Sequence, residues 1–122
     1  MFSFTEEQKL LISSVSALAK EHLAPKAEEI DETEGFNHIA FQKMAELGLL
    51  GITADEKYGG AQLGALESTL VMEKLAEACA STTLSYLAHT ILCVNNIHAN
   101  ASEPQKQKYL PKLISGEWLG AM

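Results

Sequence analysis

The sequence predicts an all-α fold, an up-down bundle of about five helices that occupies residues 1–117. Three observations lead to this prediction. Apolar residues recur at helical spacing in five separate segments. Two of those segments begin with the Ser/Thr-x-x-Gln pattern of a capping box, at Thr5 and at Ser102. Glycines follow the predicted ends of two helices, Gly48 and Gly116, where helices commonly terminate.

The first helix is predicted over residues 5–23. Thr5 and Gln8 are spaced so that each side chain can accept the backbone N–H of the other residue. Pro25 allows a break after this helix, and the acidic stretch 26–34 is only weakly periodic, which indicates one irregular, solvated helical turn. One face of the first helix carries the residues Leu11, Val15, Leu18 and His22.

The second helix is predicted over residues 38–47. Asn37 is placed to cap its N-terminus, and Gly48 is placed to end it in the left-handed conformation. The predicted apolar contacts of this helix are Ile39, Met44 and Leu47.

The third and fourth helices are predicted over residues 65–78 and 81–99, with Ser81 as the cap of the fourth. The fourth helix is apolar nearly all round, which predicts burial between neighbouring elements. The stripe predicted on the third helix consists of Leu66, Leu70, either Lys74 or Leu75, and Ala78.

Residues 55–64 (DEKYGGAQLG) form the Gly-rich loop between the second and third helices. A glycine-rich loop before a helix can bind phosphate. This loop matches neither the G-x-x-x-x-G-K-[ST] pattern nor a strand followed by G-x-G-x-x-G. The favoured interpretation is therefore a tight connection in which the glycines adopt positive φ angles.

The fifth helix is predicted from Ser102 to about Ile114, with Pro111 expected to kink or shorten it. The last residues, WLGAM at 118–122, are apolar or small and follow a turn, so they are predicted to form a β-strand. A strand without a partner leaves backbone groups unpaired. We therefore expect residues 118–122 to be the first strand of an absent β domain, and the chain to be part of a longer protein.

Composition and charge narrow the functional classes. With 47% apolar and 20% charged residues, the 122-residue chain is typical of one globular domain. The net charge of −7 argues against a nucleic-acid surface, and no apolar run is long enough for a membrane span. No signal or transit peptide is recognised, so a cytoplasmic location is expected. The nine basic residues are all lysines, so the main clamp for any phosphorylated cofactor is expected outside this chain.

Side chains capable of catalysis or metal binding form no convincing pattern. His89 and Cys93 share a helical face, and Cys79 could lie nearby, but no C-x-x-C or H-x-x-x-H pair supports zinc. The favoured interpretation of both cysteines is buried free thiols. Glu67, Glu73 and Glu77 could serve as bases, although exposed helix positions explain them more simply, and no metal site or catalytic residue is predicted.

The order of several motifs resembles the N-terminal helical domain of the acyl-CoA dehydrogenase family, closest to the isovaleryl-CoA or short branched-chain type. The resemblance covers essentially the whole chain. The matching segments are FTEEQKLL at the start, FQKMAELGLLGI at 41–52, YGG at 58–60, LVMEKLAEACAS at 70–81 and QKQKYLPKLISGEWLGAM at the end.

This resemblance implies a flavin-dependent oxidoreductase that dehydrogenates a short or branched acyl-CoA between its α and β carbons. It implies FAD as cofactor in the full-length protein, with none expected on this chain alone. Its implied partners are the acyl-CoA substrate, an electron-transfer flavoprotein, the missing β and C-terminal domains, and further copies in a homo-oligomer. The catalytic glutamate of the family belongs to a later helix, so the chain alone is expected to be inactive.

The resemblance also implies two sets of site residues. Met122 matches the first position of the flavin-contacting strand. Leu87 stands where isovaleryl-type relatives tend to carry glycine, so it is expected to narrow the acyl pocket. The positions that match the lining of that pocket are Leu84, Leu87, Ala88 and Ile91, which share one helical face.

Two alternatives remain open from the sequence. The chain could be a stand-alone helical module that binds a partner or an acyl tail without catalysis. The four pocket positions could be ordinary core residues. In addition, the family commonly has a second glycine where this chain has Gln62, so a positive φ angle there would strain the backbone or redirect the loop.

Overall fold

The computed structural model describes residues 3–122 and folds them into helices joined by short connections, with no β-strand in that range. The prediction of an all-α fold is confirmed. Two π-helical stretches, η1 (Ala19–Leu23) and η5 (Ala88–Val94), and three 3-10 turns, η2 (Ala24–Lys26), η3 (Leu49–Gly51) and η4 (Glu56–Tyr58), connect or extend the α-helices. The α-helices are α1 (Glu6–Leu18), α2 (Ala27–Thr33), α3 (His38–Glu46), α4 (Ala65–Ala78), α5 (Ala80–Leu87), α6 (Asn95–Asn100) and α7 (Glu103–Ile114).

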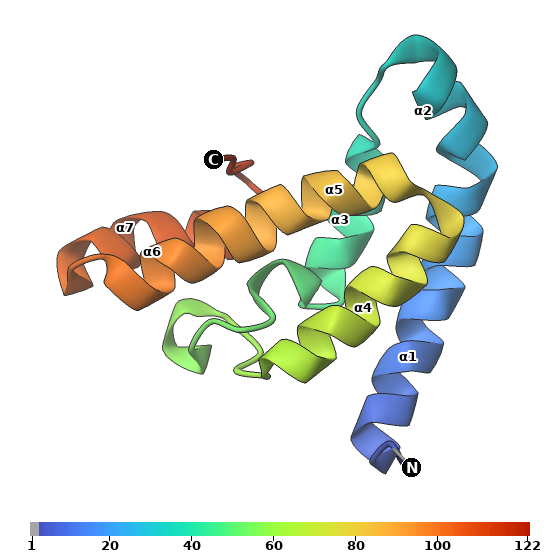
Figure 1. Ribbon diagram of the computed structural model, residues 1–122. Helices are drawn as coiled ribbons and strands as arrows, with labels where there is room; N and C mark the ends of the chain where they lie inside the picture. Colours follow the sequence, from blue (N-terminus) through green and yellow to red (C-terminus); the bar gives the residue numbers. More distant parts are fainter. Residues whose placement is uncertain (1–2) are drawn as a thin grey trace.

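The helices pack around two long helical rods (Figure 1). One rod consists of α1, η1, η2 and α2, with α2 at the far end of the molecule from the N-terminus. The other rod consists of α5, η5 and α6 and crosses the molecule in a single direction. Helix α4 packs against both α1 and α5, while α7 lies beside α6. No helix within residues 3–122 has both the length and the apolar run that crossing a bilayer requires.

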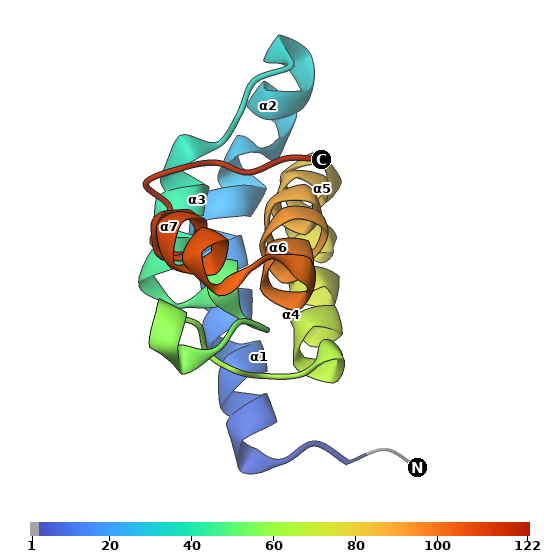
Figure 2. The same ribbon diagram turned by 90° about the vertical axis from the view of Figure 1, so that its left-hand side faces the viewer.

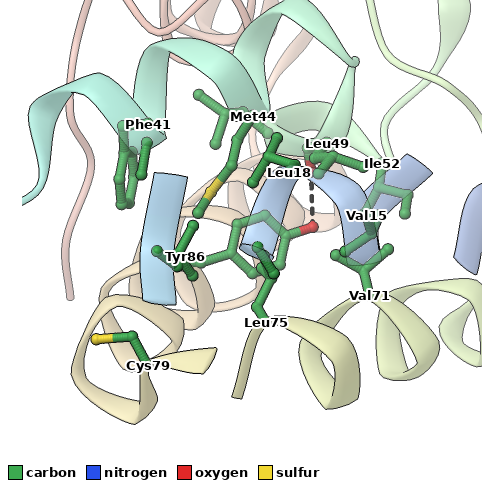
Figure 3. Packing of buried hydrophobic residues seen from close by; sticks show 14 residues of the cluster. Val15, Leu18, Phe41, Met44, Leu49, Ile52, Val71, Leu75, Cys79 and Tyr86 are labelled. Carbon is green, nitrogen blue, oxygen red and sulfur yellow. Dashed lines mark hydrogen bonds between the residues drawn. The ribbon is translucent and has the colours of Figure 1, made fainter. Parts of the chain in front are cut away.

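The main hydrophobic core lies where α1, α3, α4 and α5 meet (Figure 3). Tyr86 projects from α5 into its centre and is fully buried. A second, smaller cluster joins the loop after η3 to η5 and α7 through Ala54, Tyr58, Val94 and Leu110. The main cluster also contains Val15, Leu18, Leu23, Ala40, Phe41, Met44, Leu49, Leu50, Ile52, Val71, Leu75 and Cys79.

The predicted helix ends are largely confirmed because they depend on local chemistry. Capping boxes start α1 at Thr5 and α7 at Ser102, and Asn37 caps α3 by accepting the N–H of Ala40 at 3.0 Å. Gly48 follows α3 with a φ of +76°, as expected for its position. Pro111 lies inside α7, which continues to Ile114 and is therefore not shortened by the proline.

One predicted cap is wrong. Ser81 lies inside α5, whose N-cap is Cys79. Cys79 is the single residue between α4 and α5, and its extended backbone (φ −158°, ψ 107°) separates the two helices without a loop. Its thiol lies 3.3 Å from the hydroxyl of Thr82, in the first turn of α5. Ser81 is therefore too late in the chain to be the cap.

Three apolar residues predicted to face the core are instead exposed: Ile39, Leu47 and Leu66. In α3, the buried side chains are Ala40, Phe41 and Met44. The face of the helix that packs on the core is therefore the one with these three residues, and Ile39 and Leu47 face the solvent. The prediction that both cysteines are buried is right for Cys79 but only partly right for Cys93, which is half-buried.

Candidate functional site

The rod formed by α5 and η5 has one buried face and one open apolar face. The buried face carries Tyr86, His89, Thr90 and Val94. The prediction that this helix is buried between neighbouring elements is therefore only partly right, because the side opposite Tyr86 and His89 is half-buried or exposed. The open face includes Leu84, which is 66% exposed, and the half-buried residues Leu87, Ala88 and Ile91.

The four residues predicted to line an acyl pocket thus lie on the same partly exposed side of one helical rod. Ala88 and Ile91 belong to η5, where the wider π-helical turn replaces the α-helical turn. Single π-helical turns of this kind occur frequently at functional sites. The four side chains present apolar groups on one side of the rod.

A cavity of about 340 Å³ lies next to this face, between α4, η5 and the connection that follows η3. Ile91 and Asn95 line it from the rod, and Met72 lines it from α4. Among the lining residues, the hydroxyl of Thr53 donates a hydrogen bond of 2.9 Å to Oδ1 of Asn95. Of the four predicted pocket residues, only Ile91 borders this cavity, so Leu84, Leu87 and Ala88 belong to the open face alone.

His89 connects three parts of the molecule from the buried side of η5. Its Nε2 lies 2.9 Å from the carbonyl oxygen of Leu113 in α7, and its Nδ1 accepts the backbone N–H of Gly120 at 2.9 Å. Since a carbonyl can only accept and an amide N–H can only donate, the neutral tautomer with its proton on Nε2 satisfies both contacts. Burial lowers the pKa of His89, which favours this neutral form.

His89 was considered above as a possible metal ligand, and its role as a tether was missed. Both ring nitrogens already have protein partners. Within residues 3–122, no three His, Cys, Asp or Glu side chains are grouped so that they could hold a metal ion. The sequence indicates this role only through a histidine in a largely apolar helix. The groups that His89 binds are main-chain atoms, so no other residue type points to the contact.

Residues 118–122, called the terminal segment below, run from the end of α7 across to the rod of α5 (Figure 2). The N–H of Trp118 donates to the carbonyl of Lys112 at 3.1 Å. A side chain at Gly120 would collide with Cys93, so glycine is required there for the close approach to η5. Met122 is 81% exposed, and its sulfur accepts from the amide of Asn96 at 3.4 Å.

The Gly-rich loop is held by its own hydrogen bonds. Backbone N–H groups of Gly60, Ala61 and Gln62 donate to carbonyls of Asp55, Gly51 and Ala54 at 2.9–3.0 Å. These amides are therefore not free to surround a phosphate, which supports the structural interpretation of the loop. Gln62 has a φ of +54°, so it adopts the left-handed conformation that was anticipated as a source of strain.

None of the candidate carboxylates lines the cavity next to the open apolar face. Glu73 and Glu77 are exposed on α4, and Glu77 pairs with Lys74 at 3.0 Å. Glu67 accepts from the side chain of Gln8 at 3.2 Å, a hydrogen bond that lowers the pKa of its carboxyl group. A low pKa makes a carboxylate a weaker base, so Glu67 is poorly suited to removing a proton from carbon.

Comparison with known proteins identifies relatives of this arrangement. The family described as acyl-CoA dehydrogenase, N-terminal domain, matches residues 5–117. Mitochondrial isovaleryl-CoA dehydrogenase of Pongo abelii is 49% identical over 120 residues, which cover 97% of this chain and 28% of that protein. The chain therefore spans less than a third of the length of this relative.

Solved structures agree with the sequence match. The structure of butyryl-CoA dehydrogenase from Megasphaera elsdenii superposes with a TM-score of 0.86 at 29% identity, covering 98% of this chain and 32% of that one. A structure described as the FAD complex of PigA superposes with a TM-score of 0.88 at 25% identity, with the same coverage of 98% and 32%.

Proposed function

This chain belongs to the acyl-CoA dehydrogenase family, and on that premise we propose that it forms one wall of the acyl pocket in a flavin-dependent dehydrogenase of short or branched acyl-CoA. The open face of α5 and η5 carries the proposal. Leu84, Leu87, Ala88 and Ile91 are the proposed contacts for the acyl chain. An apolar face left uncovered within a domain that otherwise buries its core is suited to receive an aliphatic ligand together with the elements that enclose it.

The contribution of these residues is binding and exclusion of water. Burying the apolar acyl chain is favourable by roughly 25 cal/mol per Å² of apolar surface removed from water. A pocket wall of leucine, alanine and isoleucine side chains offers no hydrogen bond to water near the reacting carbons. Polarisation of the thioester carbonyl, which acidifies the α-proton, is stronger in such a dry site.

The residues present fit FAD at one point, the end of the terminal segment. Met122 is exposed there, and its polarisable thioether is well suited to pack against an aromatic ring system. FAD, when bound, supplies the acceptor for the hydride that leaves the β-carbon. The base for the α-proton and the main clamp for the cofactor phosphates are proposed to lie outside this chain, which contains no arginine. Electrons are then proposed to pass to an electron-transfer flavoprotein.

The experiment is an anaerobic titration of the protein that carries this chain, purified with FAD. Adding isovaleryl-CoA or butyryl-CoA is expected to bleach the absorbance of the oxidised flavin and to produce the corresponding 2-enoyl-CoA. Free CoA, which carries no acyl group, is the control and is expected to leave the flavin oxidised. Retention of the oxidised spectrum with every short acyl-CoA tested contradicts the proposed function.

A further inference from the structure

The terminal segment is fixed to the helical bundle at several points, although it has no secondary structure of its own. Trp118 is bonded to the last turn of α7, Gly120 to His89, and Met122 to Asn96. Of these three contacts, the one made by Gly120 is the most protected from water, because His89 is only 1% exposed. The position of the segment therefore depends most strongly on a single buried side chain.

We propose that His89 is a positioning residue, which holds the main chain of Gly120 against η5 and thereby sets where Met122 meets the flavin. The flavin part of this inference rests on the function proposed above. The same imidazole is bonded to Leu113, so it also links the terminal segment to the end of α7. Three elements, η5, the end of α7 and the terminal segment, thus meet at one side chain.

Two features make the contact specific to histidine and glycine. Histidine can donate through one ring atom and accept through another on the opposite side of the ring, so a single side chain satisfies both main-chain groups. Glycine allows the backbone to approach closely, because a Cβ atom at Gly120 would lie 3.0 Å from Cβ of Cys93 and still closer to its sulfur. The histidine thus satisfies both main-chain groups, and the glycine fits beside Cys93.

The surroundings of His89 are apolar, which strengthens the contact. The ring of Phe41 packs edge-on against the imidazole of His89, with 5.9 Å between the ring centroids. The side chain closest to the Cα of Gly120, on the side where a Cβ would lie, is that of Cys93. A hydrogen bond in such surroundings is stronger than in water, and an unpaired partner is costlier. Loss of the Nδ1 acceptor would leave the backbone N–H of Gly120 without a hydrogen-bond partner in these apolar surroundings.

Two substitutions separate the links made by His89. In His89→Gln, the side-chain amide nitrogen can reach the position of Nε2 and still donate to Leu113, but no acceptor remains at the position of Nδ1 for the N–H of Gly120. In His89→Asn, the side-chain oxygen can take the position of Nδ1 and accept from Gly120, while the link to Leu113 is lost. The pair therefore distinguishes the positioning contact from a general effect on stability.

The first measurement is hydrogen exchange of the backbone, followed by mass spectrometry of the C-terminal peptide of this region in the complete protein. His89→Gln is expected to speed exchange at Gly120 roughly three- to tenfold, the equivalent of one net hydrogen bond. His89→Asn is expected to retain exchange close to that of the wild type. Wild-type exchange at Gly120 in His89→Gln overturns the proposal, and so does equal acceleration in both variants.

The second measurement is the dissociation constant for FAD, obtained from flavin fluorescence with the same three proteins. His89→Gln is expected to weaken FAD binding roughly three- to tenfold, with His89→Asn near the wild type. Faster exchange without weaker FAD binding overturns the positioning role toward the flavin. A wild-type protein that binds no FAD instead overturns the proposed function, and this is seen before any variant is compared.

Discussion

The hydroxyl of Tyr86 donates a hydrogen bond of 2.8 Å to the backbone carbonyl of Leu49, inside the main core (Figure 3). Both residues are almost completely buried. Leu49 begins η3, a short 3-10 turn in the apolar interior, where its carbonyl accepts the phenolic O–H. The contact therefore joins α5, the rod with the open apolar face, to the connection between α3 and the Gly-rich loop.

Replacing Tyr86 with phenylalanine is expected to destabilise the fold by about 1–3 kcal/mol, because the buried carbonyl of Leu49 loses its donor. The Tm is expected to fall by several degrees. Thermal unfolding followed by circular dichroism measures this change. The matched control is Tyr109→Phe, since Tyr109 is 37% exposed and water can reach its hydroxyl. Equal shifts in the two variants contradict the role given to the Tyr86 hydroxyl.

Gly60→Ala is expected to be strongly destabilising, since the added methyl group would overlap the backbone carbonyl of Ala54. Forcing such an atom into a packed site costs about 1–3 kcal/mol or more, and a backbone atom cannot move aside as a side chain can. Gly64→Ala is the control in the same loop region. There the nearest atom is a carboxylate oxygen of Glu67 at 3.1 Å, which can rotate away.

Urea denaturation measures both variants. A stability of Gly60→Ala equal to that of Gly64→Ala would show that the loop does not approach Ala54 as closely as described. The comparison also tests the path of the loop around Gln62, whose N–H donates to the same carbonyl of Ala54.

Much of the fold could be predicted because helix ends are encoded locally. The bounds 65–78 and the capping boxes at Thr5 and Ser102 depend only on residues three or four positions apart. Which face of a helix is buried depends on neighbours distant in the sequence. This is why Ile39, Leu47 and Leu66 were wrongly expected in the core, and the π-helical stretches gave no signal in the apolar pattern.

The candidate site was predictable only in part, for a similar reason. The resemblance to the family singled out Leu84, Leu87, Ala88 and Ile91, and their spacing along one helix is consistent with a common side, which the structure leaves partly exposed. The tether made by His89 joins it to residues 24 and 31 positions away. Both partners are main-chain groups, which every residue carries, so the identity of Leu113 or Gly120 gave no indication of the contact.

The stability of the protein is expected to fall at acidic pH through His89. Burial lowers the pKa of His89 in the folded protein below the ordinary value of 6.5, whereas the unfolded chain titrates near that value. The unfolded state therefore binds more protons in the interval between the two pKa values. The contribution of neutral His89 to the free energy of unfolding is complete above pH 6.5. It is lost as the pH falls from 6.5 through the lower pKa that His89 has in the folded protein.

Urea denaturation at a series of pH values measures this dependence. His89→Gln is expected to give a flatter curve below pH 6.5, so that the difference in free energy of unfolding between the wild type and the variant shrinks on acidification. Ser85→Gly, which removes no titratable group, is the control and is expected to keep the wild-type dependence. Parallel curves for the wild type and His89→Gln would contradict this source of pH dependence.

Replacing Leu87 with glycine is expected to widen the proposed acyl pocket and shift the preference of the enzyme toward longer or bulkier acyl chains. One methylene group in a hydrophobic pocket changes discrimination by roughly tenfold or more. The ratio of kcat/KM for hexanoyl-CoA to that for butyryl-CoA is therefore expected to rise by about tenfold. Ser85→Gly is the control, because it introduces the same flexible residue into α5 on the side that borders Phe36 and Asn37, away from the open face. An unchanged ratio in Leu87→Gly, or the same rise in Ser85→Gly, would show that Leu87 does not limit the pocket.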